Sequence, residues 1–189
     1  MQMLLGIFSA FGLSASAGLN AYIPLFVIGL LAHYTDLIKL QAPWDTLSNP
    51  WILILLGLLL IIEMLADKIP AVNHINDLIQ TFVRPVAGAI AFAASANLIT
   101  NMSPVLALAC GLFVAGSVHI AKSVAVRPLV TATTAGAGNV PVSIAEDIVS
   151  TLVSVLAIVV PILVGILLVI LLAFFLWWLW RRADKAQAA

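Results

Sequence analysis

Residues 77–84 read DLIQTFVR, and they open a long apolar stretch of the chain. Their polar side chains have the spacing of one helix face, namely Asp77, Gln80 or Thr81, and Arg84. Residues 147–154, DIVSTLVS, repeat the pattern with Asp147, Ser150 or Thr151, and Ser154. Two such stripes at matching places predict facing polar walls between helices. The alternative is that Asp77 caps a helix and Arg84 reaches out to the membrane interface.

The composition around these octets is that of an integral membrane protein. Hydrophobic residues make up 63% of the 189 residues and charged residues only 8%, whereas soluble domains average about a quarter charged. Eight acidic and eight basic side chains give no net charge, so nothing indicates a nucleic acid partner. The single cysteine, Cys110, excludes an internal disulfide and a cysteine-based zinc site.

The apolar segments predict an all-α, polytopic helical bundle. Backbone N–H and C=O groups find no partner in lipid, and a helix pairs them within the segment itself. A bilayer core about 30 Å thick needs roughly 20 apolar residues per span. We expect about six spans, near 4–33, 51–67, 75–99, 103–125, 144–160 and 162–180. The first is interrupted at GLNAYIP (18–24). The last two are separated only by Pro161, either by a tight turn, which we favour, or as one long kinked helix.

Basic residues set the expected orientation. In the six-span arrangement Lys39 lies on one side, and the other side holds Lys68, Lys122, Arg127, Arg181, Arg182 and Lys185. The positive-inside rule makes that second side cytoplasmic, with both termini inside. Trp177, Trp178 and Trp180 are typical of an interfacial belt closing the last span.

The two octets also indicate an internal repeat within a single domain, 1–189. The repeat units are 51–99 and 103–160, followed by a C-terminal helix over 162–182. PAVNHIND (70–77) resembles PVSIAED (141–147) ahead of the octets. Internal repeats are common in transporters, with the site at the repeat interface. Parallel hairpins and an inverted pairing of three spans with three are both compatible with the sequence.

The segment EMLADKIP (63–70) carries the strongest functional signal. Glu63 and Asp67 are i,i+4 neighbours on one helix, where like charges repel. Relief requires a proton, a bound cation or basic partners such as Lys68, Lys122 or His119. Ionisable groups inside a membrane indicate function by default. A Glu63 that simply reaches the interface and pairs with Lys68 is the structural alternative.

The segment before the second octet has mainly structural explanations. Ser143 and Glu146 fit a capping box at the start of a helix. The preceding loop, RPLVTATTAGAGNVPVS (127–143), is expected to be a cytoplasmic connector, with a re-entrant gate as the alternative. Arg127, Gly136, Gly138 and Asn139 are its candidates for holding an anion near a helix N-terminus.

Small residues recur every fourth position in two places. One stripe is Gly6, Ala10, Ser14 and Gly18, and the other is Ala107, Gly111 and Ala115, continuing into His119. Such faces let helices approach closely in lipid. We expect packing inside the chain, and a homo-oligomer formed through Gly6–Gly18 is compatible with the same pattern.

Three motifs together give a family resemblance: GLNAYIPL, DKIPAVNHINDLIQTFVRPVAG and TTAGAGNVPVSIAEDIVS. They resemble the bacterial membrane family called domain of unknown function 4126, over most of the chain up to about residue 160. The resemblance implies a bacterial cytoplasmic (inner) membrane location and supplies no activity.

Taken together, the sequence predicts a transporter or channel for a small solute or ion, proton- or cation-coupled. A protein that binds or moves a phosphate-headed lipid and a non-transporting assembly protein are the alternatives. The transport candidates are Asn20, Glu63, Asp67, Asp77, Thr81, Arg84, His119, Lys122, Asp147 and Thr151. No nucleophile–base arrangement and no metal-ligand spacing is present, so we expect no enzymatic activity, cofactor or metal, and the lipid bilayer as surroundings.

Overall fold

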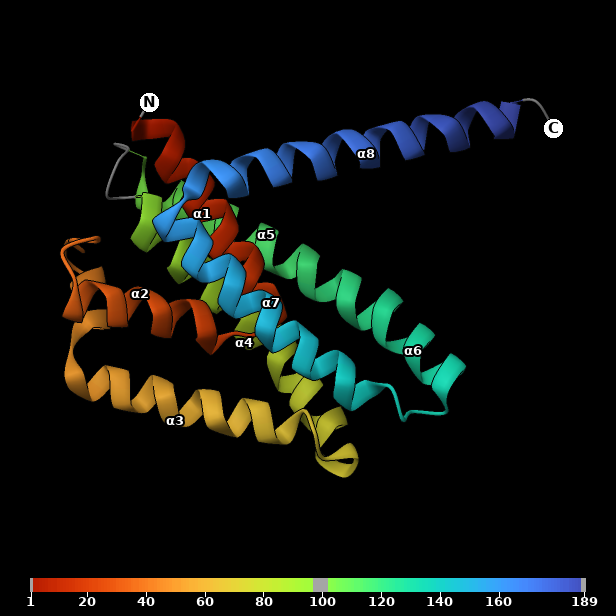
Figure 1. Cartoon of the computed structure of the whole chain (residues 1–189), viewed down its shortest axis with the longest axis horizontal. Coiled ribbons are helices and arrows are strands. Elements are labelled where there is room, and N and C mark those ends of the chain that lie inside the picture. Colours follow the sequence, from red (N-terminus) through yellow and green to blue (C-terminus); the bar gives the residue numbers. More distant parts are fainter. Residues whose placement is uncertain (1, 97–101, 188–189) are drawn as a thin grey trace.

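A computed structural model describes residues 2–96 and 102–187, and the regular elements over these ranges are all helical. Figure 1 shows the helices gathered around α1 and α4, with the last helix leaving the bundle. The predicted all-α class is therefore confirmed. The elements are α1 (Gln2–Leu19), α2 (Tyr22–Tyr34), η1 (Trp44–Ser48), α3 (Pro50–Ala66), α4 (Pro70–Ala96), α5 (Pro104–Ile120), η2 (Ala121–Val126), α6 (Arg127–Thr134), α7 (Asn139–Val159) and α8 (Pro161–Gln187).

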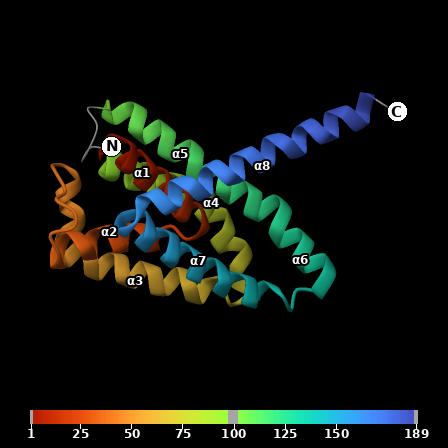
Figure 2. The ribbon, with the colours of Figure 1, turned by 45° about the horizontal axis from the view of Figure 1, so that its top comes forward.

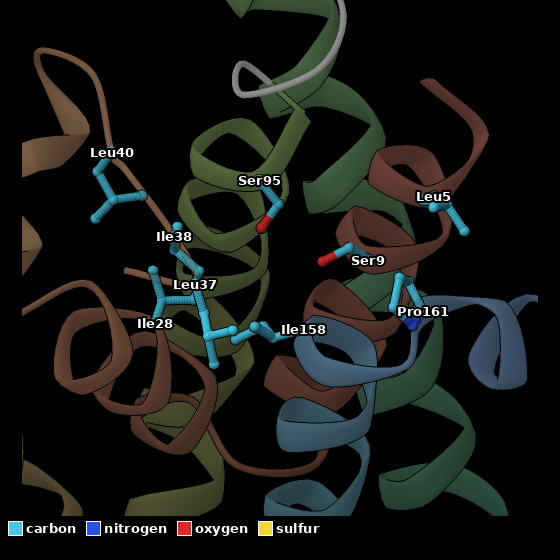
Figure 3. A pocket seen from close by; sticks show the side chains of 9 residues that line it. All are labelled: Leu5, Ser9, Ile28, Leu37, Ile38, Leu40, Ser95, Ile158 and Pro161. Carbon is cyan, nitrogen blue, oxygen red and sulfur yellow. The ribbon is translucent and has the colours of Figure 1, made fainter. Parts of the chain in front are cut away.

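The first apolar segment breaks where the sequence predicts, between Leu19 and Tyr22, but the chain also reverses direction there. A Cβ added at Gly12 of α1 would lie 2.9 Å from Ala157 of α7. Ile158, which follows Ala157 on α7, lines a small cavity together with Leu5 of α1 and Ile28 of α2 (Figure 3). Both α1 and α2 therefore lie beside the same part of α7. Thus α1 and α2 form a hairpin whose tip is residues 19–22. This differs from the single passage expected for 4–33, on which the inside location of the N-terminus depended.

The next elements form two hairpins that run in the same direction, α3 with α4 and α5–α6 with α7 (Figure 1). The second is longer than predicted, because α5 continues through η2 into α6 as one apolar stretch from Pro104 to Thr134. The loop expected over 127–143 is therefore wrong for most of its length. The segment from Arg127 to Ala135 contains no glycine, so nothing there ends the helix. The chain turns at Ala135 (φ 51°) and Gly136 (φ 88°), which are both left-handed.

Small residues bring α1, α4 and α5 into close contact, as the second stripe predicts. A Cβ at Gly111 would lie 2.6 Å from the Cβ of Phe92 and would meet the carbonyl of Gly88. Ser14 of α1 donates to the Gly111 carbonyl at 2.8 Å. On α1, Gly6, Ala10 and Ser14 are buried, and Gly18 packs against Ala115. The face considered for oligomerisation is thus occupied within the chain.

The break at Pro161 is a turn rather than a kink. Val160 separates α7 from α8, and Figures 1 and 2 show α8 leaving in a new direction. The start of α8 packs on the bundle, where Gly165 lies against Phe8 of α1. Near its other end, the Arg181 guanidinium lies 4.6 Å from the Trp177 ring centre.

Three helices in the described ranges are long and apolar enough to cross a bilayer: Ile75–Ala96, Pro104–Thr134 and Asn139–Val159. Four more apolar helices are shorter, Leu4–Leu19, Tyr22–Tyr34, Pro50–Ala66 and Pro161–Phe175. The protein is therefore a membrane-associated helical protein. The count of six spans and the internal repeat stay predictions.

Candidate functional site

Charged side chains gather where the tip of the α1–α2 hairpin meets α3, α4, η2 and α7. We call this group the charged cluster. It contains five of the eight carboxylates of the chain and four of its eight lysine and arginine side chains. Its members are Glu63, Asp67, Asp77, Glu146, Asp147, Lys68, Arg84, Lys122 and Arg127, together with His119 and Asn20.

The centre of the cluster is a fully buried ion pair between Glu63 of α3 and Arg84 of α4. Both side chains are 0% exposed, and Arg84 Nη2 lies 2.9 Å from Glu63 Oε1. Arg84 Nε donates to the same oxygen at 3.2 Å. The backbone N–H of Ala21 donates to Glu63 Oε2 at 3.2 Å. A buried pair of charges persists only when such additional hydrogen bonds offset its desolvation.

Glu63 and Asn20 together satisfy the start of α2. The first N–H groups of any helix have no partner inside the helix. Besides the Ala21 N–H held by Glu63, Asn20 Oδ1 accepts from Tyr22 N at 3.1 Å and from Ile23 N at 3.2 Å. Asn20 Nδ2 then donates to Asp147 of α7 at 2.9 Å. The N-terminus of α2 is thus held directly by Glu63 of α3 and by Asn20 of the break, which is bonded in turn to Asp147 of α7.

Lys122 satisfies the end of α1 in the same way. Its ammonium donates to the carbonyl of Leu19, the last residue of α1, at 3.0 Å. It also lies 2.7 Å from Glu146 of α7. A cation at a helix C-terminus complements the helix dipole. Both broken helix ends at the hairpin tip are therefore stabilised by buried charges.

Arg127 joins three carboxylates, one directly after α3, one on α4 and one on α7. Its Nη2 lies 3.0 Å from Asp67 and 3.5 Å from Glu146, and its Nη1 lies 3.1 Å from Asp77. The π-helical turn η2 makes this possible, because its i→i+5 bonding widens the turn. Side chains five residues apart, Lys122 and Arg127, then point to the same interior, and both are buried.

The repulsion predicted between Glu63 and Asp67 is relieved by arginines. Arg84 Nη2 lies 3.6 Å from Asp67 as well as 2.9 Å from Glu63. Asn76 donates to Asp67 Oδ1 at 2.7 Å. Burial raises the pKa of Asp67, which directly follows α3, but the charges of Arg127, Arg84 and Lys122 outweigh it and leave the pKa below its usual value.

His119 is neutral in this arrangement, with its proton on Nε2. A guanidinium only donates, so Arg84 Nη1 donates to His119 Nδ1 at 3.3 Å. Thr81 Oγ1 donates to the Asp77 carbonyl at 2.8 Å and therefore accepts from His119 Nε2 at 3.2 Å. The predicted residues Thr81, Arg84 and His119 thus form one hydrogen-bonded chain.

Asp77 and Asp147, the first residues of the two octets, do not face each other. Asp77 pairs with Arg127, whereas Asp147 pairs with Lys68 at 3.4 Å and with Asn20. The serines of the second octet, Ser150 and Ser154, instead contact α1. Ser16 lies 2.7 Å from the hydroxyls of both Ser150 and Ser154.

The remaining predicted residues lie outside the cluster. Thr151 donates to the carbonyl of Asp147 and lines an open groove of about 230 Å³ beside Met64. Gly136, Gly138 and Asn139 lie at the turn between α6 and α7, where the Asn139 side chain bonds to the Thr131 hydroxyl. This turn follows the last residue of α6, Thr134, seven residues after Arg127.

The capping box predicted for Ser143 and Glu146 at the start of a helix is wrong. The helix α7 begins at Asn139, ahead of Ser143, and the Ser143 hydroxyl donates to Asp67 at 3.4 Å. Glu146 pairs with Lys122 and Arg127. Its position beside Asp147 is the only signal in the sequence. Asn76 is a further cluster residue that sequence reasoning missed, although it precedes Asp77 directly.

A cavity of about 100 Å³ lies on the other side of the serine contacts from the cluster. Figure 3 shows the hydroxyls of Ser9 (α1) and Ser95 (α4) pointing toward each other across it. The rest of its lining is apolar, including Ile28 and Ile158. Polar groups therefore continue along α1 beyond the cluster.

Comparison with protein families matches residues 7–182 to one family model, described as domain of unknown function (DUF4126). The match covers most of the chain and includes the motifs of the hairpin tip, the cluster and both octets. No curated protein and no solved structure matches the chain.

Proposed function

The chain belongs to the DUF4126 family, and from its charged cluster we propose a proton- or cation-coupled transporter or channel for a small solute or ion. The protein works in this proposal in the bacterial cytoplasmic membrane, surrounded by lipid. It has no catalytic step, no cofactor and no nucleic acid partner.

The proposal rests on one observation, a broken helix whose two free ends are held by buried charges. Glu63 holds the start of α2 and Lys122 holds the end of α1. Discontinuous helices supply substrate and ion sites in many secondary transporters, because their unpaired backbone groups become ligands. Irregular backbone at membrane depth is otherwise tolerated only inside protein or beside a water-filled cavity.

Hydroxyl groups supply a polar route between the cluster and the opposite cavity. Ser9 and Ser95 line the cavity, and Ser16 with Ser150 and Ser154 lies between them and Asn20. These side chains are on α1, α4 and α7, the helices that form the interior of the bundle. Such groups replace the hydration of a small polar solute more readily than aliphatic side chains do.

Glu63 is the group that we expect to couple charge to movement. Neutralising it by a proton weakens its attraction for Arg84 and removes the charge that holds the Ala21 N–H. The hairpin tip is then freer to move, and Arg84 can pair fully with Asp67, which already lies 3.6 Å from it. The change is a local electrostatic event acting on a movable element.

In the lipid alternative, Arg84, Lys122 and Arg127 are the cations that would hold the phosphate. Each of them faces at least one carboxylate within the cluster. The glycines expected to grip the phosphate lie in the α6–α7 turn, away from the buried cations. This arrangement favours transport over phosphate-headed lipid binding, and the assembly alternative assigns no role to the charges.

The proposal is tested with purified protein in liposomes that carry an internal pH dye. An outward potassium gradient with valinomycin sets the voltage, and a panel of small solutes is added under an imposed pH gradient. We expect proton or solute flux above that of empty liposomes, reduced at least tenfold in Glu63→Gln and in Asp77→Asn. Asp36→Asn, on a side chain 99% exposed, should keep the flux. Equal flux in all four proteins would overturn the proposal.

A further inference from the structure

Gln80 of α4 is a buried amide with an unused acceptor. Its side chain is 2% exposed, and its Oε1 accepts no hydrogen bond from any group in the described parts of the chain. Leaving such an oxygen without a donor costs about 1–3 kcal/mol. Buried polar atoms in this situation usually mark an ordered water or an ion.

The position of Gln80 directs it into the charged cluster. Asn76, Gln80 and Arg84 are four residues apart, so they share one face of α4. The two outer members both reach Asp67, Asn76 at 2.7 Å and Arg84 at 3.6 Å. The residue that carries the unused oxygen therefore lies on the face of α4 that borders Glu63 and Asp67.

The described charges of the cluster do not balance. Five carboxylates, Glu63, Asp67, Asp77, Glu146 and Asp147, face four cations, Lys68, Arg84, Lys122 and Arg127. His119 adds no charge, because it accepts from Arg84. An unbalanced charge in a site of low dielectric constant is costly and attracts a counter-ion or a proton.

We propose that the charged cluster binds one monovalent cation at Gln80 Oε1, either an alkali-metal ion or a hydronium ion. One positive charge balances the carboxylates, and the same species gives the amide oxygen the partner it lacks. Amide and carboxylate oxygens are the ligands that hard cations prefer. No three His, Cys, Asp or Glu side chains in the described ranges are arranged to hold a metal ion, which disfavours a more highly charged metal.

This inference rests on the proposed function, since it names the coupling ion of the same site, but its test needs no transport. The full-length protein in detergent micelles is unfolded by heat in two series. One series replaces choline chloride by NaCl or KCl at constant ionic strength, and the other lowers the pH from 8 to 6 in choline chloride. We expect Tm to rise in one series with the logarithm of the cation concentration, by about 3 °C per tenfold increase above the dissociation constant.

Three variants separate this site from general effects of salt or pH. Gln80→Leu removes the acceptor, and Asp77→Asn brings the described charges to four and four. Both are expected to abolish the response. Gln41→Leu, on an exposed glutamine outside the helices, should retain it.

The outcomes separate the two sources of positive charge. A response in the metal series that is absent in Gln80→Leu identifies an alkali-metal ion, and one confined to the pH series identifies hydronium. No response in either series, or an equal response in Gln80→Leu, overturns the inference. Flux that is lost in Glu63→Gln but independent of Gln80 would overturn this inference alone, whereas equal flux in Glu63→Gln would overturn the proposed function.

Discussion

Arg84 shows how single residues keep charge inside this protein. It is fully buried, yet its guanidinium has Glu63, Asp67 and His119 as partners. Arginine suits this position because its planar group donates in several fixed directions and stays protonated. The same side chain placed at a membrane interface would have needed none of these partners.

Removing Arg84 should therefore be costly. Arg84→Met leaves Glu63 buried without its cation, and we expect a loss of about 3–5 kcal/mol in the free energy of unfolding. The double variant with Glu63→Leu should recover part of the loss, because no uncompensated charge remains. Unfolding in mixed micelles measures both. Arg181→Met, outside the cluster, is the control, and an equal loss there would contradict a special role for Arg84.

At the scale of helices, close packing depends on where glycine is placed rather than on how many glycines there are. On α5, Gly111 lies against the backbone of α4, whereas one turn further a Cβ at Gly116 would have only an ordinary contact, 3.8 Å from Pro85. In lipid, where no hydrophobic force drives helices together, such contacts decide which helices become neighbours.

These two glycines give a matched test on one helix. Gly111→Ala should destabilise the protein by about 1–3 kcal/mol, because the added methyl group meets Phe92 and Ala89. Gly116→Ala should be neutral or stabilise by up to roughly 1 kcal/mol through its higher helix propensity. Thermal unfolding of both variants in micelles checks the difference. The packing argument is contradicted if both variants unfold at the wild-type temperature.

The whole molecule has its charged cluster toward one end and its small cavity nearer the other, because α1 and α2 form a hairpin. The tip of this hairpin reaches the cluster, while the start of α1 and the end of α2 lie toward the opposite end (Figure 1). The N-terminus and the segment after α2 should therefore lie on the same side of the membrane.

Labelling with a membrane-impermeant maleimide tests this arrangement in a Cys110→Ser background. An N-terminal epitope tag and Asp36→Cys should be accessible from one side. Ala137→Cys, in the α6–α7 turn, should be accessible only from the other, which the positive-inside rule makes cytoplasmic. If the tag and Asp36→Cys report opposite sides, the first segment crosses the membrane once, as the sequence alone suggested.

Four features could be predicted from the amino-acid sequence alone: the helical class, the break at residues 18–24, the turn at Pro161 and the small-residue stripe on α5. These features follow from composition and from local rules, because glycine, asparagine and proline act on the backbone next to them. The sequence also singled out most of the charges, since an ionisable residue inside an apolar segment is visible without a structure.

Which charged side chains contact one another depends on how the helices pack. Helical periodicity gives the face on which Glu63, Arg84 or Glu146 lies, but it does not say which helix stands opposite. The π turn that directs Lys122 and Arg127 inward, and the reversal at the hairpin tip, have no distinct sequence signal here. Partners such as Lys122 and Leu19 are 103 residues apart, so their contact exists only once the helices have packed.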